Sequence, residues 1–362
     1  MTSTNQPRLT VRSTADLITA VPYLLGFHPS ESVVMVAMRD TRIIFVARGD
    51  LPPGAHGDAP GVARFLADVV GAQDAQTATI IGYGPAERVT PVIDEIRAAF
   101  DPAAAGRALP RLLDALRVTD GRYWSYFCDN PRCCPIDGTP FDPTTSQFAA
   151  EATVAGQVAL PDRAALVRQV EPVTGPARDS MRRATALAEE RLADLLDDAP
   201  PADLLGGRTL RRAGAAAVTA ALARHREGGV LTDDEVGWLT LLLTHLPVRD
   251  DAWERTDGTE WHLTLWTDVL RRAEPDLVPA PACLLSFTAW RAGQGALAAV
   301  ALERALVAQP DYSMAHLLGD LLARGVPPSR LDGWPRVGGR LRRPTARRKP
   351  NRRHKRGRHC AN

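Results

Sequence analysis

The apolar positions follow two different patterns along the chain, and the change between them falls near residue 145. Before that point, short runs rich in β-branched residues alternate with stretches in which apolar residues recur every three or four positions. Runs of the first kind are typical of strands, and the longer spacing is typical of helices. The pattern predicts strands over 32–38, 42–47, 78–82 and 123–128, and helices over 62–70, 86–100 and 109–116.

The residues that flank the first elements add detail to this prediction. Arg39-Asp40-Thr41 separates the first two strands by a length that suits a β-hairpin. Ser13 is a typical helix N-cap ahead of a helical apolar spacing that starts at Leu17. We expect Pro22 to kink this first helix or end it early, because proline lacks the N–H that a helix interior needs.

From residue 146 onward the chain shows helical periodicity and almost no strand signal. The predicted helices cover 146–158, 162–170, 176–197, 207–226, 232–246, 260–272, 280–292, 295–308 and 311–324. The last three place small residues and a proline near the positions of a tetratricopeptide unit, namely Gly293, Ala298, Ala301, Ala305 and Pro310. Only about one such unit is visible, so we expect a helix hairpin of that kind rather than a repeat array.

These patterns predict an α/β N-terminal layer, with a mixed sheet that contains a hairpin, followed by an all-α half. We place the α/β domain at 1–145, the helical domain at 146–332 and a disordered, Arg-rich tail at 333–362. The start of the chain has no apolar segment typical of an export signal, and no apolar run approaches the roughly 18 residues of a membrane span. The five cysteines are an odd number and do not form a secreted disulfide pattern, so we expect a cytoplasmic protein.

Charge is divided unevenly between the tail and the rest of the chain. Residues 336–362 contain twelve Arg or Lys residues and no Asp or Glu. Subtracting these twelve from the 44 basic residues of the chain leaves 32 against 42 acidic residues, a net charge of −10. Such a basic segment engages polyphosphates through counterion release, and the predicted contacts are Arg342, Arg343, Arg347, Arg348, Lys349, Arg352, Arg353, Lys355 and Arg356.

Several partners suit this tail. Nucleic acid is the first, and binding would be non-specific because no aromatic residue lies beyond Trp334 to stack on bases. An anionic membrane surface, an acidic protein face or no dedicated partner at all are the alternatives. A protein partner for the helical half is also expected.

Three cysteines cluster in a turn that contains Asn130, Pro131 and Pro135. The spacing Cys128-x4-Cys133-Cys134 gathers three soft ligands within seven residues, and zinc takes four ligands in a structural site or three plus water in a catalytic one. His28 and Asp129 are the candidates for a fourth ligand. The alternatives are buried, packed thiols or a redox pair of Cys128 and Cys133.

A second candidate site lies in the loop between the first helix and the first strand. Pro29 forces His28 out of the helical conformation, and Ser30 and Glu31 follow directly. A histidine, a hydroxyl and a carboxylate are the groups that general base and nucleophilic catalysis use. The alternative is a turn in which Ser30 and Glu31 satisfy backbone donors.

Two further segments contain candidate chemistry. The strand-to-helix turn Gly82-Tyr83-Gly84-Pro85 could accept an anion at the helix start, with a plain βα turn as the alternative. The aromatic residues around Trp261, with His262 beside them, have the helical spacing of a packed core.

Three segments resemble a known family. They are DLITAVPYLLGFHPSESVV at 16–34, RYWSYFCDNPRCCPIDGTP at 122–140 and the stretch 261–315. They are similar to the actinobacterial "domain of unknown function 4192" proteins over most of residues 9–325. The resemblance implies that both halves belong to one module and assigns no activity.

Two hypotheses for function follow. In the first, the protein is a non-enzymatic interaction or regulatory protein whose tail binds nucleic acid. In the second, it is a small-molecule enzyme such as a metal-dependent hydrolase, whose pocket joins His28 and Glu31 to the Cys128–Cys134 turn.

Overall fold

The first half of the chain folds into a mixed sheet with helices on both faces. The computed structural model describes residues 13–54, 57–101, 106, 108–143, 146–154 and 158–331. The sheet has the strand order β2-β1-β3-β4-β5-β6. Its strands are β1 (Ser32–Arg39), β2 (Arg42–Asp50), β3 (Thr77–Tyr83), β4 (Arg111–Thr119), β5 (Arg122–Ser125) and β6 (Thr139–Pro140). The predicted α/β layer is confirmed, and the tail beyond residue 331 lies outside the described residues.

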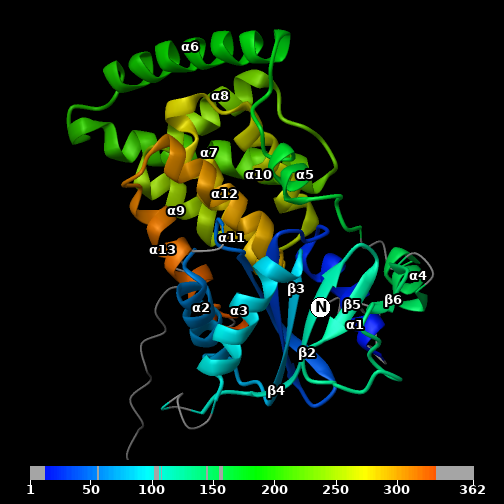
Figure 1. Cartoon of the computed structure of the whole chain (residues 1–362). Helices are drawn as coiled ribbons and strands as arrows, with labels where there is room; N and C mark the ends of the chain where they lie inside the picture. The colour runs from blue at the N-terminus through cyan, green and yellow to red at the C-terminus, as the bar shows by residue number, and fades with distance from the viewer. Residues whose placement is uncertain are drawn as a thin grey trace, which may run out of the picture.

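The strand β1 lies inside the sheet and is covered on both faces. It pairs with β2 on one side and with β3 on the other, both antiparallel, and the β1–β2 pair is the predicted hairpin. Because successive side chains of a strand point to opposite faces, Val33 and Met35 pack in one apolar cluster while Val34 and Val36 pack in another. The first cluster lies under α2 (Ala59–Gly71) and α3 (Ala86–Ala99), and the second lies under α1 (Thr14–Leu25) (Figure 1).

The strand β4 corrects one prediction. The sequence pattern predicts a helix over 109–116, but residues 111–118 pair in parallel with β3 and residues 116–119 pair antiparallel with β5. Leucine, alanine and arginine favour a helix on their own, and partners on both sides of β4 override that local preference. The turn from β4 to β5 uses Asp120 and Gly121 at φ 50° and 69°, the conformation of a two-residue hairpin turn.

The helix α1 corrects the prediction that Pro22 ends it early, whereas a kink at Pro22 stays a prediction. Pro22 lies inside this helix and does not end it, since α1 continues to Leu25 and stops at Gly26, which has φ 83°. One missing backbone hydrogen bond is outweighed because residues 17–22 are buried against the sheet.

The second half of the chain is helical, as predicted. Its helices are α4 (Gln147–Val154), α5 (Arg163–Arg168), α6 (Pro176–Asp197), α7 (Gly207–Arg226), α8 (Asp233–Leu242), α9 (Leu246–Glu254), α10 (Glu260–Arg272), α11 (Pro279–Arg291), α12 (Gly295–Ala308) and α13 (Ser313–Ala323). The helix predicted over 232–246 ends at Leu242, and Pro247 stands in the first turn of a separate helix, α9. The hairpin of α11 and α12 buries Ala298, Ala301 and Ala305 in the core of this half.

The two halves meet near the end of the described chain (Figure 1). The side chain of Gln73, which follows α2, donates to the carbonyl of Gly325 at 2.9 Å, and these residues are 252 positions apart. A β-carbon at Gly325 would lie 2.9 Å from the Phe45 ring, so the chain there approaches the sheet half closely. In the part of the chain that the structure describes, no helix combines the length and apolar character that a bilayer crossing demands.

Candidate metal centre

The three clustered cysteines lie in a loop, residues 126–138, that leaves β5 and returns to it. The strand β6 pairs with β5 directly after the loop. The indole N–H of Trp124 donates to the carbonyl of Ile136 at 3.0 Å, and the Arg122 guanidinium donates to the carbonyl of Gly138 at 2.9 Å. Gly138 has φ 78°, and a β-carbon there would lie 2.5 Å from the Trp124 ring. Both ends of the loop are therefore fixed to the same short strand.

A tight turn inside this loop places the thiols together. The backbone carbonyl of Asn130 accepts hydrogen bonds from the N–H groups of Cys133 (3.0 Å) and Cys134 (2.7 Å). The side-chain oxygen of Asn130 accepts from the N–H of Arg132 at 3.0 Å. As a result the sulfur atoms of Cys128, Cys133 and Cys134 all lie within 4.8 Å of one another, and those of Cys133 and Cys134 are 3.9 Å apart.

These separations are close to those of a metal site. With Zn–S bonds of about 2.3 Å, tetrahedral geometry puts two thiolate sulfurs about 3.8 Å apart. The cysteine cluster, meaning Cys128, Cys133 and Cys134, therefore needs sulfur movements of less than about 1 Å to hold a metal ion such as zinc. Among the described residues, no fourth His, Cys, Asp or Glu lies close enough to join the three cysteines. The fourth position of a tetrahedral metal ion would therefore face solvent or a partner.

Local hydrogen bonds make the three thiols unequal. The backbone N–H of Asn130 and then the thiol of Cys134 donate to the Cys128 sulfur, and they hold the pKa of Cys128 below its usual range. Donation to Cys128, followed by burial, raises the pKa of Cys134 to about 12. These hydrogen bonds therefore favour the thiolate form at Cys128 and the thiol form at Cys134.

Asp114 is the carboxyl group whose charge acts on Cys128 of this cluster, and no pattern in the sequence indicates it. Its side chain accepts from the Ser125 hydroxyl at 2.7 Å and from the backbone N–H of Ala115 at 2.8 Å. Burial raises the pKa of Asp114, and a negative charge there opposes ionisation of Cys128. The antiparallel pairing of β4 with β5, which the sequence pattern did not predict, brings this carboxyl group to the start of the loop.

The structure does not bring His28 to the cysteine cluster. His28 comes just before Ser32, which pairs with Tyr83 at the end of β3. The strand β5 runs antiparallel to β4, so the chain from Ser125 to Cys128 continues toward the opposite end of the sheet, where β4 begins. Three strand spacings of about 4.8 Å each also separate β1 from β5, roughly 14 Å in all. His28 is exposed, and its backbone N–H donates to the carbonyl of Leu160 at 2.9 Å.

The neighbours of His28 connect the loop to other elements. Glu31, at φ 43°, forms an ion pair with Arg88 of α3, and its carbonyl accepts from the N–H of Leu51 at 2.9 Å. Ser30 is exposed. The Glu31 side chain thus pairs with Arg88 of α3, and a turn in which Ser30 and Glu31 satisfy backbone donors stays a prediction.

The Glu31 carboxylate also lies beside the turn at 82–85, which is the candidate anion site at the start of α3. A β-carbon at Gly84, which has φ 145°, would lie 3.2 Å from an oxygen of Glu31. Pro85 caps α3 without a side-chain hydrogen bond. Glu31 therefore already supplies a negative charge at the start of this helix.

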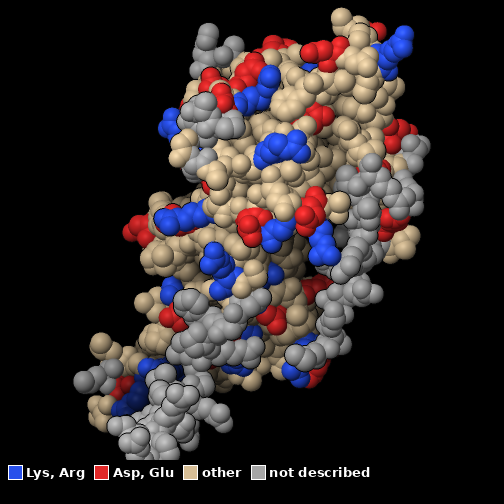
Figure 2. Space-filling view, turned by 90° about the horizontal axis from the view of Figure 1, so that it is seen from below, with Lys and Arg blue, Asp and Glu red and all other residues tan. Residues whose placement is uncertain are grey.

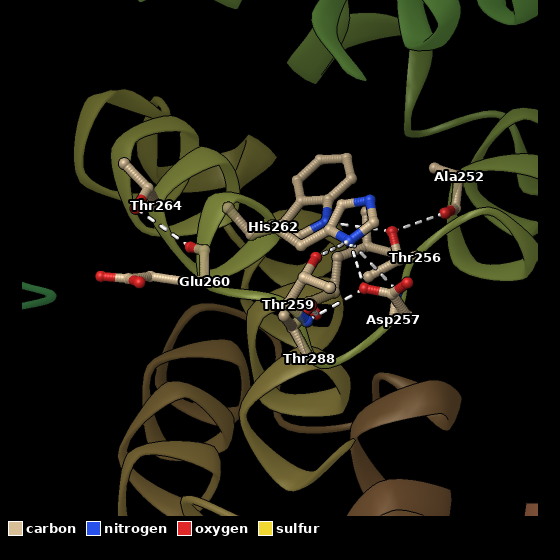
Figure 3. A network of polar contacts seen from close by, with 10 residues as sticks. Ala252, Thr256, Asp257, Thr259, Glu260, His262, Thr264 and Thr288 are labelled. Carbon is tan, nitrogen blue, oxygen red and sulfur yellow. Dashed lines mark hydrogen bonds and ion pairs between the residues drawn. The ribbon is translucent and has the colours of Figure 1, made fainter. Parts of the chain in front are cut away.

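A buried polar network surrounds His262 at the start of α10 (Figure 3). The Nδ1 atom of His262 lies 2.8 Å from a carboxylate oxygen of Asp257 and 3.0 Å from the hydroxyl of Thr259, while its Nε2 atom is buried without a partner. The Trp261 and His262 ring centroids are 3.5 Å apart, and the indole of Trp266 donates to the hydroxyl of Thr256 at 3.1 Å. Burial lowers the pKa of His262. The network links Thr256 and Asp257, which precede α10, to the buried side chains of Trp266 and His262. This agrees with the core packing that the spacing of the aromatic residues predicts.

Comparison with known proteins covers both halves of the chain. Residues 15–329 match the model of one family, described as Domain of unknown function (DUF4192). No curated protein and no solved structure gives a significant match. The matched region contains the cysteine cluster and ends before the basic tail.

Proposed function

Because the chain belongs to the DUF4192 family, whose description assigns no activity, we propose a function from the site itself, namely binding of a zinc-class metal ion by the cysteine cluster. The proximity of the three sulfur atoms carries this proposal. Thiolates select soft ions such as Zn²⁺ and Cu⁺ over Mg²⁺ or Ca²⁺. The turn at Asn130 and the anchors at Trp124 and Gly138 hold the ligands near bonding distance, so little ordering is required when the ion binds.

The loop around the ion suits a non-enzymatic role. Phe127 and Ile136 lie on the same loop, with relative exposures of 42% and 92%, and exposed apolar side chains of this size are typical of contact surfaces. A metal ion at the cluster would fix this loop as a surface for another macromolecule. A hydrolytic pocket shared with His28 lacks support, since the two segments lie at opposite ends of the strands.

The proposal also includes a cellular localisation. The cysteines of the described residues are free thiols, and thiolate metal sites persist where thiols are kept reduced, so we place the protein in the cytoplasm. Contact of the helical half with a protein partner remains part of the same proposal.

Metal content tests the proposed site. The full chain, purified under reducing conditions with added zinc and then dialysed, should retain one zinc ion per chain by elemental mass spectrometry. Cys128→Ser, Cys133→Ser and Cys134→Ser should each lose it. Cys283→Ser is the matched control, because Cys283 is fully buried in the helical core and remote from the loop in sequence.

Cobalt provides an independent readout of the same ligands. Co²⁺ bound by three thiolates should produce an intense thiolate-to-metal charge-transfer band that disappears in the Cys133→Ser protein. A chain that retains less than about a tenth of an equivalent of zinc and shows no such band would refute the proposal.

A second function is carried by a different observation, the separation of charge along the sequence. The twelve basic residues of 336–362 lie beyond the family match, while the rest of the chain is acidic overall. On the face seen in Figure 2, basic and acidic side chains of the described residues are interspersed and form no large patch of one sign. We therefore propose that nucleic acid binds the tail without sequence preference.

Deletion of residues 336–362 tests this second proposal. Fluorescence anisotropy with single-stranded and double-stranded oligonucleotides should show binding by the full chain that weakens steeply with salt. The truncated protein should lose that binding and keep its zinc. Unchanged binding after truncation would refute the role of the tail.

A further inference from the structure

The members of the cysteine cluster differ in their access to solvent. Cys133 is exposed, whereas Cys128 and Cys134 are partly buried, and Cys283 is fully buried in the helical core. A small oxidant in solution therefore reaches Cys133 first, since access is one of the factors that set thiol reactivity.

Covalent geometry decides which thiol can then pair with Cys133. Adjacent α-carbons are about 3.8 Å apart across a trans peptide, and disulfides need about 4.4–6.8 Å between α-carbons. The peptide bonds of the described residues are all trans, so a bond between Cys133 and Cys134 would be strained. Cys128 is five positions away, and its sulfur already lies within 4.8 Å of the Cys133 sulfur. Formation of the bond requires these two sulfurs to close to about 2.05 Å.

We propose that Cys133 is a site of peroxide oxidation and that Cys128 is its resolving thiol. In the first step the Cys133 sulfur attacks one oxygen of hydrogen peroxide, the O–O bond breaks, and a sulfenic acid and hydroxide form. In the second step the Cys128 sulfur attacks the sulfenic sulfur, the S–O bond breaks, and the departing hydroxide takes up a proton. The balance is two thiols and one hydrogen peroxide giving one disulfide and two waters.

Oxidation at this pair has a consequence for the ion. The disulfide removes two of the three thiolates and leaves Cys134 alone, and a single thiolate does not hold zinc. Metal release on oxidation rests on the proposed zinc site, but formation of the Cys128–Cys133 bond does not. The cluster would thus report peroxide by losing its ion, and reduction of the disulfide would restore it.

The test uses the full chain with Cys360→Ser, which removes the tail thiol and leaves the cluster and the buried Cys283. Zinc-loaded protein is titrated with hydrogen peroxide while a chromogenic chelator measures released zinc and peptide mass spectrometry maps the crosslinks. We expect one zinc released per Cys128–Cys133 disulfide, and recovery of both free thiols with dithiothreitol. Cys134→Ser should still form the crosslink, while Cys128→Ser should leave a sulfenic acid on Cys133 that a dione reagent traps.

Three outcomes would overturn the proposal. The first is a crosslink that pairs Cys134 instead of Cys133. The second is oxidation of Cys133 to sulfinic acid with no crosslink at one equivalent of peroxide. The third is reaction of Cys283 as fast as Cys133. If the protein holds no zinc, the proposed metal site fails, and mapping the crosslink in metal-free protein still decides between these outcomes and the expected one.

Discussion

Substitution of Gly138 by alanine tests the link between the backbone of the cysteine loop and its metal affinity. Gly138 has φ 78°, a conformation that costs an ordinary residue roughly 1–2 kcal/mol. Its new β-carbon would also lie 2.5 Å from Trp124 Cε2, well inside the usual 3.5–4.0 Å between carbons. Forcing such an overlap apart costs typically about 1–3 kcal/mol, because a ring held by its hydrogen bond to Ile136 cannot simply turn away.

Together these costs amount to about 2–5 kcal/mol in the loop. Because every 1.4 kcal/mol is a factor of ten, zinc affinity should fall at least about fivefold in Gly138→Ala, even if half of the strain is relieved in the metal-free loop. Competition with a chelator of known affinity measures this change. Gly121→Ala is the matched control, since Gly121 also has positive φ (69°) but a β-carbon there would meet only the Phe141 carbonyl, at 3.8 Å.

The two variants separate local strain from the overlap with Trp124. Gly121→Ala should lower the free energy of unfolding by about 1–2 kcal/mol and leave zinc affinity near that of the unaltered protein. Equal zinc affinities in the two variants would refute the reasoning that Trp124 and Gly138 hold the cysteine cluster in place.

Three more predictions concern the helical half. Burial lowers the pKa of His262, so below about pH 6.5 the unfolded chain binds a proton that the folded state excludes, and stability falls as the pH drops through that range. Urea unfolding at pH 8 and pH 5.5 should therefore show a smaller loss of unfolding free energy in His262→Asn than in the unaltered protein. Gly237→Ala should lower the melting temperature, because the new β-carbon would lie 3.1 Å from the backbone of α6. Gly319→Ala has open space around the new β-carbon, so it should raise the free energy of unfolding by about 0.5–1 kcal/mol and with it the melting temperature. Arg178→Ala should destabilise by about 2–4 kcal/mol in chemical unfolding, because it leaves a largely buried carboxylate unpaired, while Arg182→Ala, whose ion pair is exposed, should change stability by less than about 0.5 kcal/mol.

Elements with strong local patterns were predictable from the sequence. The β1–β2 hairpin and the helices of the second half follow from period-two runs, helical spacing and caps such as the Thr232–Glu235 capping box. The strand β4 was not predictable, because its residues prefer a helix and only its pairing with β3 and β5 makes it a strand. The break between α8 and α9 was not predictable either, because Pro247 directly follows the helix predicted over 232–246, whereas α8 ends earlier, at Leu242.

The candidate site was predictable only where its residues are close in sequence. Cys128, Cys133 and Cys134 are within one turn, so their proximity follows from the chain itself. Asp114 reaches the loop through strand pairing, and the absence of His28 from it follows from the antiparallel direction of β1. Contacts that depend on which strands are neighbours carry no periodic signal in a single sequence.

The contact between Gln73 and Gly325 has a consequence for synthesis on the ribosome. The sheet half is synthesised first, but Gln73 and the Phe45 ring can be covered by the segment around Gly325 only after that segment has left the ribosome. A contact across 252 positions is among the slowest kinds to form, since the intervening chain must be ordered before its ends can meet. During translation this apolar side stays open for chaperones, and a ribosome that stalls before residue 325 would release a chain with that side uncovered.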